Sequence, residues 1–140
     1  MKTVLLVMGV VLLLVGIESA EKYVQVDYSG QNSNQISHAK PDFGKTFLLM
    51  KVIIANHGYV DVYTNPNYFF VMADNVTYNY DASSHYLKDI GMPILDVNSH
   101  LRDGGMISGF LVFQIPVNAS RYELKYDDYR GKNIRYNSLS

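Results

Sequence analysis

The clearest chemical signals in this sequence are two acceptor motifs for N-linked glycans. Asn75-Val76-Thr77 and Asn118-Ala119-Ser120 both fit the pattern Asn-x-Ser/Thr, in which the asparagine amide carries the sugar. Each triplet lies at an expected turn beside a strand, where a bulky solvated group is tolerated. Such triplets also arise by chance in a chain rich in asparagine. Asn75 and Asn118 are therefore candidate glycosylation sites, provided that an exporting host supplies the enzymes.

The titratable residues are not spaced as a catalytic or metal site. Asp81, Ser83 and His85 have the residue types of a hydrolytic triad, but they share one short stretch, whereas triad members converge from separate parts of a fold. Cysteine is absent, which excludes thiol catalysis and cysteine-bound zinc. Asp127 and Asp128 offer oxygen ligands for calcium, but their spacing matches no calcium loop. We expect a protein that is not an enzyme, with no cofactor and no metal site.

Tyrosines supply the third candidate group. Six of the 12 tyrosines fall between residues 59 and 86: Tyr59, Tyr63, Tyr68, Tyr78, Tyr80 and Tyr86. Exposed together on one sheet face, they would form a binding surface, because aromatic side chains dominate the energetics of interfaces. The alternative is cross-strand aromatic packing that stabilises the sheet itself.

The N-terminal segment indicates the compartment. Residues 4–17 follow a short basic start and are apolar apart from two glycines, which is typical of a secretory signal and shorter than the ~20 residues that span a membrane. Ser19 and Ala20 permit cleavage after Ala20, although Glu18 occupies a position that prefers a small residue. We expect residues 1–20 to form a hydrophobic helix, either a cleaved signal or a retained membrane anchor. The remaining chain would be secreted or extracytoplasmic.

Residues 21–140 are predicted to form one all-β domain. The strongest strand covers residues 46–58, and one of its faces carries Leu48, Met50, Val52 and Ile54. Its other face is apolar apart from one lysine, which places the strand in the interior of a sheet. Residues 106–116 form the second strong strand. Its Phe113 and Ile115 are expected to meet the first strand across the core of a sandwich.

Weaker alternating segments complete the predicted fold. They lie at residues 22–28, 59–63, 68–73, 76–80, 122–126 and 134–136. Short strands separated by turn residues at this spacing are typical of an antiparallel β-sandwich of roughly seven strands.

Two stretches resemble a known family. Residues 47–58 are similar to its aromatic and aliphatic strand that ends in Asn-x-Gly, and residues 105–116 are similar to its strand Gly-x-x-x-Gly-x-x-x-Phe-x-[Val/Ile]-Pro. Leu124-Lys125-Tyr126 matches the Leu-x-Tyr that follows. The family is an immunoglobulin-like domain of unknown function, related to telokin-like and immunoprotective secreted antigens, and it occurs in exported proteins and lipoproteins of prokaryotes.

The resemblance covers about residues 24–127. It implies an immunoglobulin-like sandwich and carries over no catalytic residue, because the family has none established. Asn75 stands where the family usually has glycine, and the lipid-attachment cysteine of its lipoproteins is missing.

The sequence thus predicts an exported interaction module of the cell surface or secreted medium, with an unknown protein or glycan as partner. Lys and Arg number 12 against 13 Asp and Glu, and no basic stripe suggests nucleic acid. Membrane contact is expected only through the N-terminal segment. One alternative is a structural envelope component that self-associates through a sheet edge. The second is an extracytoplasmic protein that binds a small ligand or metal ion.

Overall fold

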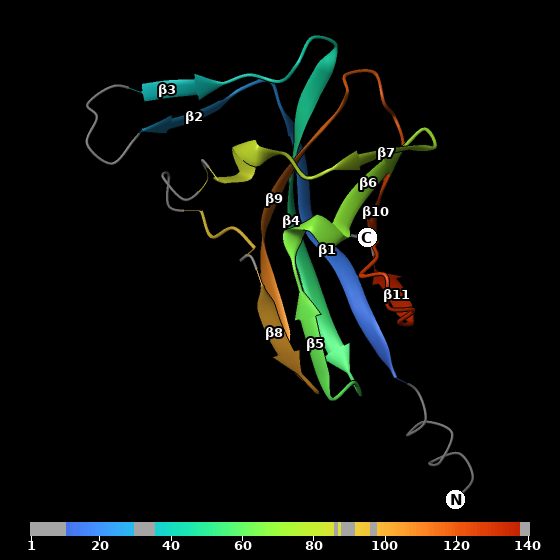
Figure 1. The fold of residues 1–140 in the computed structure, drawn as a ribbon. Helices are drawn as coiled ribbons and strands as arrows, with labels where there is room; N and C mark the ends of the chain where they lie inside the picture. Colours follow the sequence, from blue (N-terminus) through green and yellow to red (C-terminus); the bar gives the residue numbers. More distant parts are fainter. Residues whose placement is uncertain (1–10, 30–35, 86, 88–91, 96–97, 138–140) are drawn as a thin grey trace, which may run out of the picture.

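The computed structural model describes residues 11–29, 36–85, 87, 92–95 and 98–137, which form an all-β molecule (Figure 1). Its strands are β1 (Leu12–Tyr23), β2 (Val26–Ser29), β3 (Ile36–Ala39), β4 (Lys45–His57), β5 (Asp61–Thr64), β6 (Phe69–Ala73), β7 (Val76–Asn79), β8 (Ser99–Arg102), β9 (Met106–Pro116), β10 (Tyr122–Tyr126) and β11 (Ile134–Asn137). Two single-turn 3-10 helices, η1 (Pro66–Tyr68) and η2 (Ala82–His85), interrupt them.

Two sheets and two ribbons organise these strands. The larger sheet has the order β11-β1-β4-β9 and the smaller one the order β10-β6-β7, while β2-β3 and β5-β8 are two-stranded ribbons. The all-β arrangement in more than one sheet is consistent with the predicted β-sandwich, but the described residues contain eleven strands, because the two ribbons add four to the roughly seven that were predicted. The ribbon β2-β3 projects from the body of the molecule (Figure 1).

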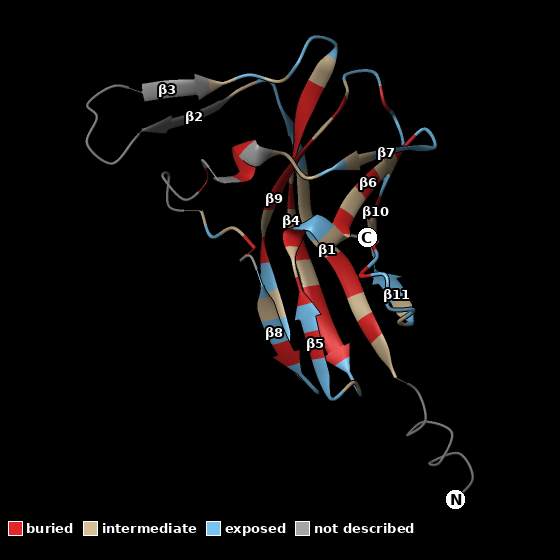
Figure 2. Ribbon diagram, in the orientation of Figure 1, coloured by how far each residue is buried: buried red, intermediate tan, exposed pale blue. Residues whose placement is uncertain are grey.

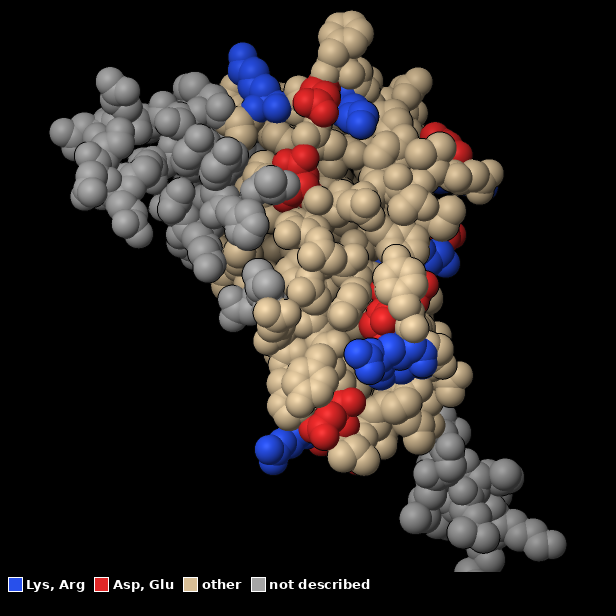
Figure 3. Space-filling model, in the orientation of Figure 1, with Lys and Arg blue, Asp and Glu red and all other residues tan. Residues whose placement is uncertain are grey.

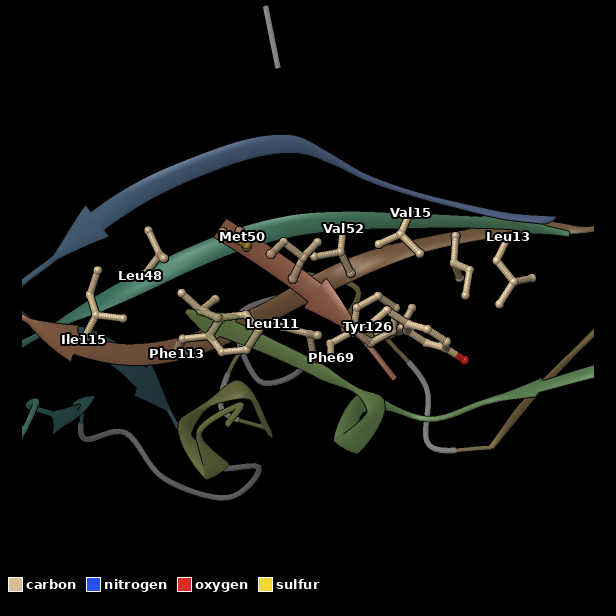
Figure 4. Packing of buried hydrophobic residues seen from close by; sticks show 14 of the residues in the cluster. Leu13, Val15, Leu48, Met50, Val52, Phe69, Leu111, Phe113, Ile115 and Tyr126 are labelled. Carbon is tan, nitrogen blue, oxygen red and sulfur yellow. The ribbon is translucent and has the colours of Figure 1, made fainter. Parts of the chain in front are cut away.

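The core lies between the two sheets, and β4 supplies its centre. Four side chains of β4 are fully buried: Leu48, Met50, Val52 and Ile54. This is the face that alternation predicts. The opposing layer contributes Phe69 and Val71 from β6 and Leu124 and Tyr126 from β10. Figure 4 shows side chains of β4 pointing toward the layer that carries Phe69 and Tyr126, and Figure 2 shows the buried stripe along β4.

The expected placement of the second strong strand is wrong in one respect. β9 lies beside β4 in the same sheet, with Leu48 opposite Phe113 and Met50 opposite Leu111, rather than across the core from it. The two strands therefore share one wall, and β6 and β10 form the other. Alternation along a strand reveals which side chains share a face, but it does not reveal which strand is the neighbour.

The second face of β4 is also covered. Phe47 is 1% exposed and packs with Val112 of β9 and with Leu87, which follows η2. The segment that contains Ile94 pairs with Phe110 along the outer edge of β9. A side chain at Gly109 would place its Cβ 2.5 Å from the Leu95 backbone nitrogen, so glycine is required for this approach.

The N-terminal helix is not supported by the structure. Residues 12–20 form most of β1, which pairs antiparallel with β4 from Leu12 opposite His57 to Tyr23 opposite Phe47. Residues 1–10 lie outside the described part of the chain. β1 therefore continues across residue 20, where hydropathy places the domain boundary. No helix in the described part of the chain has the length and apolar character that crossing a membrane requires.

Burial explains why β1 is apolar. Leu13 and Val15 are fully buried and belong to the same core cluster as the β4 face. A strand that is central in its sheet and faces the core carries a run of apolar residues. The same run satisfies the hydropathy criterion for a targeting segment.

Two smaller predictions also need correction. The strand expected at residues 22–28 is divided between the end of β1 and the start of β2. The sheet is not wholly antiparallel, because β11 runs parallel to β1, with Leu13 opposite Ile134.

The Asn-x-Gly motif closes the turn after β4. Asn56 is fully buried, and its side-chain amide donates hydrogen bonds to the carbonyl oxygens of Tyr59 (2.9 Å) and Leu101 (3.1 Å). Its Oδ1 accepts a hydrogen bond from the Tyr59 amide. Gly58 has φ of +99°, which glycine adopts without strain. The motif is therefore a structural device that ties β4 to β5 and β8.

Candidate functional site

One end of the larger sheet exposes three apolar side chains, and we call it the apolar end. Phe43, in the loop before β4, is fully exposed at 106% of its reference area. Val24 follows β1 and Val117 follows β9, at 79% and 60% exposure. The register places the three at the same end of the sheet, because Tyr23 pairs with Phe47 and Lys45 pairs with Pro116 there.

The loop that carries Phe43 is fixed by hydrogen bonds of the residues before and after it in the chain. The Asp42 amide donates to Gln114 Oε1 of β9 at 2.7 Å, and the Lys45 amide donates to the Asp42 carbonyl at 2.9 Å. The Val117 amide donates to the Gly44 carbonyl at 2.9 Å. Gly44 has φ of +79°, so it turns the chain into β4 at low cost. Phe43 is therefore exposed to solvent on a loop that hydrogen bonds hold in place.

Next to this loop, the end of β1 is joined to the start of β4 and to the turn after β9. Thr46 Oγ1 donates to the Tyr23 carbonyl at 3.0 Å, and the Lys22 ammonium donates to the Ala119 carbonyl at 2.9 Å. Ala119 is 2% exposed, and its amide donates a hydrogen bond to the Pro116 carbonyl that closes the turn. The three apolar side chains thus sit on a single connected framework.

The charges around the apolar end are mixed. Glu21, Lys22, Lys40 and Asp42 are all exposed there. The Tyr23 hydroxyl donates a hydrogen bond to Glu21, and this bond raises the pKa of Tyr23 above its ordinary value. Figure 3 shows acidic and basic groups interspersed over one face of the molecule, without a field of one sign. The apolar end is suited to noncovalent contact with an apolar partner surface bordered by polar groups.

The predicted tyrosine surface is distributed over the molecule. Tyr59, Tyr68, Tyr78 and Tyr80 are partly buried and pack against the core. Tyr63 is 64% exposed, and Tyr86 lies outside the described residues. Among the five that are described, the structure therefore exposes one and uses four for packing.

Tyr63 belongs to a separate group on the ribbon β5-β8. Its ring stacks on that of His100, with centroids 4.5 Å apart and planes 8° from parallel. His100 Nε2 lies 2.6 Å from Asp61 Oδ1. All three side chains are exposed, and the ribbon stands at the end of the larger sheet opposite to Phe43. The pairing stabilises the ribbon through cross-strand contact.

Both sequon asparagines are exposed at turns. Asn75 occupies the second position of the β6-β7 turn with φ of +67°, after Asp74 with φ of +51°. Positive φ at both positions is typical of a tight two-residue hairpin, and asparagine tolerates it where the related family has glycine. Asn118 follows Val117 in the turn after β9. Glycosylation at either site remains a prediction.

The acidic and hydroxyl residues near η2 have structural partners. Asp81 accepts hydrogen bonds from the Ser83 amide and from Gln114 Nε2, and Ser84 Oγ accepts one from the Val112 amide. Burial raises the pKa of Asp81, but the bonds from Ser83 and Gln114 and the nearby Lys45 charge outweigh burial and lower it overall. These bonds attach η2 to β9. The side chain of His85 lies outside what the structure describes.

The aspartates considered for calcium make local contacts. Asp127 Oδ1 accepts a hydrogen bond from the Tyr129 amide. Asp128 is 6% exposed and forms an ion pair with Lys132, at 2.5 Å. Over the described residues, no three histidine, aspartate or glutamate side chains are close enough to hold a metal ion.

Sequence reasoning missed the apolar end, although one local signal was present. Phe43 stands between Pro41-Asp42 and Gly44, and these flanking residues are turn formers. A large aromatic residue at a turn has no strand or helix to bury it. Val24 and Val117 carried no comparable signal, because only the register of the sheet places them at the same end as Phe43.

The fold of the chain resembles the crystal structure of a "putative lipoprotein (ycdA)" from Bacillus subtilis subsp. subtilis str. 168, with a TM-score of 0.55 and 16% sequence identity. The similarity covers 84% of this chain and 32% of that one, so this chain spans about a third of the Bacillus protein. No curated protein matches the chain. The family model of the Domain of unknown function (DUF4352) matches residues 18–134, and the chain therefore belongs to the DUF4352 family.

Proposed function

We propose that this domain is an extracytoplasmic interaction module without enzymatic activity, and that its apolar end contacts the partner. The observation that carries the proposal is the fully exposed Phe43 on a loop fixed by hydrogen bonds. A buried aromatic ring removes about 150–250 Å² of surface from water on contact, and little conformational entropy is lost when the loop is already ordered. The partner is a protein or glycan with an apolar surface.

The extracytoplasmic location rests on two observations. The fold is similar to that of the Bacillus protein described as a "putative lipoprotein", and the apolar run after the basic start also includes residues 4–11, upstream of β1. We further propose that the sandwich is of the immunoglobulin-like class related to telokin-like and immunoprotective secreted antigens. The four-plus-three arrangement of strands in the two sheets supports this class.

The position of β1 restricts how a leader could be removed. Cleavage after Ala20 would take away Leu13 and Val15, which are fully buried. For export to leave β1 intact, cleavage has to occur upstream of Leu12. Mass spectrometry of the N-terminus of the exported protein tests this point.

The experiment uses the full chain labelled with a fluorophore and added to cells of the organism that encodes it. We expect Phe43→Ser to raise the protein concentration that gives half-maximal cell binding by about tenfold or more, as for an aromatic residue at the centre of an interface. Met106→Ser is the matched control, because Met106 is 62% exposed on β9 at the opposite end of the same sheet.

Both substitutions replace exposed side chains, so both variants should keep the melting temperature of the native sequence. Equal binding by Phe43→Ser and the native sequence would rule out the apolar end as the contact surface. Equal loss in both variants would show that binding is nonspecific and would also contradict the proposal.

A further inference from the structure

The smaller sheet ends in a strand that has no neighbour on one side. β10 pairs with β6, and it is the terminal strand in the order β10-β6-β7. A hollow of about 260 Å³ borders this edge of β10 and is lined across from it by Val15 and Ile17 of β1 and by Tyr136 and Asn137 of β11. Neither β1 nor β11 continues the hydrogen-bonded ladder of β10 within the described residues.

The hydrogen bonds show which backbone groups of β10 point outward. The Asp127 amide donates to the Tyr68 carbonyl on the β6 side at 2.9 Å. The Tyr126 amide points the other way and donates to the Tyr136 hydroxyl at 2.9 Å. Because backbone direction alternates along an antiparallel strand, Leu124 and Tyr122 also direct their amide and carbonyl groups outward. In the described part of the chain, no residue pairs with these groups of Leu124.

The side chains of β10 are self-complementary. Its sequence is Tyr122-Glu123-Leu124-Lys125-Tyr126, which has opposite charges placed symmetrically about Leu124 and tyrosines at both ends. Glu123 and Lys125 project on the outer face, where they form an ion pair of 3.3 Å within the chain, and their side chains are 71% and 34% exposed. Leu124 and Tyr126 face the core.

We propose that β10 is a homodimerisation edge, which pairs antiparallel with β10 of a second copy about a twofold axis at Leu124. In this register Glu123 lies opposite Lys125 of the partner subunit and Lys125 lies opposite the partner's Glu123. Opposite charges directly across an antiparallel pair stabilise it. The amide of each Leu124 donates a hydrogen bond to the carbonyl of the other Leu124. In the monomer the Tyr136 hydroxyl hydrogen-bonds the outward amide and carbonyl groups of Tyr126. In the dimer it moves away, so that Tyr126 can pair with Tyr122 of the partner subunit.

A twofold pairing of this kind is closed. Each copy contributes the same edge, and the edge is used up in the dimer, so the pairing does not propagate into a filament. The surface is small, which predicts a weak, concentration-dependent dimer rather than an obligate one. The edge is separate from the apolar end, so this inference stands independently of the proposed function.

The test is sedimentation of the full chain over about a hundredfold range of concentration, because mass action makes dimerisation concentration-dependent. The mean mass of the native sequence should rise toward that of a dimer. Glu123→Lys and Lys125→Glu should each remain monomeric at concentrations where the native sequence is half dimeric, because each places like charges opposite one another. An equimolar mixture of the two variants should form a heterodimer.

The matched control is Arg102→Glu, which reverses an exposed charge on β8. This variant should dimerise like the native sequence. Circular dichroism should show that all three variants are folded, because Glu123 and Arg102 are exposed and Lys125 is only partly buried. A native chain that stays monomeric throughout, single reversals that dimerise normally, or a mixture that forms no heterodimer would each overturn the proposal.

Discussion

The two sheets of this domain differ in length, burial and completeness. β1, β4 and β9 have 12, 13 and 11 residues, whereas β10, β6 and β7 have five, five and four. β4 is paired on both sides by long strands, and segment 94–95 covers the free side of β9. The larger sheet therefore supplies the rigid body of the fold, and the smaller sheet closes the core while leaving an edge open.

The parts of the domain that stabilise the fold therefore differ from the parts proposed to contact other molecules. The core face of β4 is covered by β6 and β10 of the smaller sheet. Exposed apolar side chains of the larger sheet lie near the ends of its long strands, with Val24, Phe43 and Val117 at one end and Met106 at the other. The smaller sheet exposes backbone groups along β10. A binding surface is most precise when it stands on rigid elements, and both candidate surfaces here border the same core.

Removing residues 1–20 should have the largest effect, because it takes away most of β1. The loss includes Leu13 and Val15, and truncating a buried aliphatic side chain costs about 2–5 kcal/mol at each position. A typical domain has only about 5–15 kcal/mol of stability. We expect the shortened chain to lack a cooperative melting transition in circular dichroism. A shortened chain that melts like the full one would show that the larger sheet does not need β1.

Phe113→Ala should destabilise the fold by about 3–5 kcal/mol, because the side chain is fully buried beside Leu48 in the larger sheet. Leu124→Ala in the smaller sheet is the matched comparison. Leu124 is 6% exposed and has fewer atoms to lose, so a smaller cost of about 2 kcal/mol is expected. Urea unfolding of both variants measures the difference. Equal or reversed costs would contradict the dominance of the larger sheet.

Alkaline pH should act on the smaller sheet through Tyr126. Burial raises the pKa of Tyr126 to about 12, although its hydroxyl donates to Thr64 Oγ1 at 3.1 Å. Because the folded-state pKa exceeds the unfolded value of about 10, the native fold holds this proton more tightly. Stability should therefore fall as pH rises from about 10 to 12, by no more than about 2 kcal/mol.

Tyr126→Phe is the control for that effect. It removes the hydroxyl, so this part of the alkaline loss should disappear, while the variant should be less stable at neutral pH by about 1 kcal/mol. Urea unfolding at a series of pH values measures both effects. An unchanged slope between pH 10 and 12 would show that Tyr126 does not carry the alkaline transition.

The sequence predicts the strands well where side-chain alternation is strong, but it does not predict which strands pair with each other. β4 and β9 follow from period-two burial, and β9 begins and ends at the predicted Met106 and Pro116. Their placement side by side could not be predicted, because pairing depends on long-range register. Residues 12–17 satisfy the criteria for both a buried strand and a targeting segment, and hydropathy alone does not separate the two.

The candidate surfaces show the same limit. The composition of the tyrosine cluster suggests a surface, but burial in the structure uses Tyr59, Tyr68, Tyr78 and Tyr80 for packing. Phe43 could be suspected from its neighbouring turn residues, whereas Val24 and Val117 join it only through strand register. The free edge of β10 follows from sheet order, which no local pattern encodes.

Amide hydrogen exchange on the full chain measures the role of β1 most directly. With β1 as a central strand of the larger sheet, amides of residues 13–17 that bond to β4 should exchange as slowly as those of β4, at the rate of global unfolding. The outward amide of Leu124 should exchange much faster than these. Rapid exchange throughout residues 13–17, with β4 still protected, would show that the fold does not include β1.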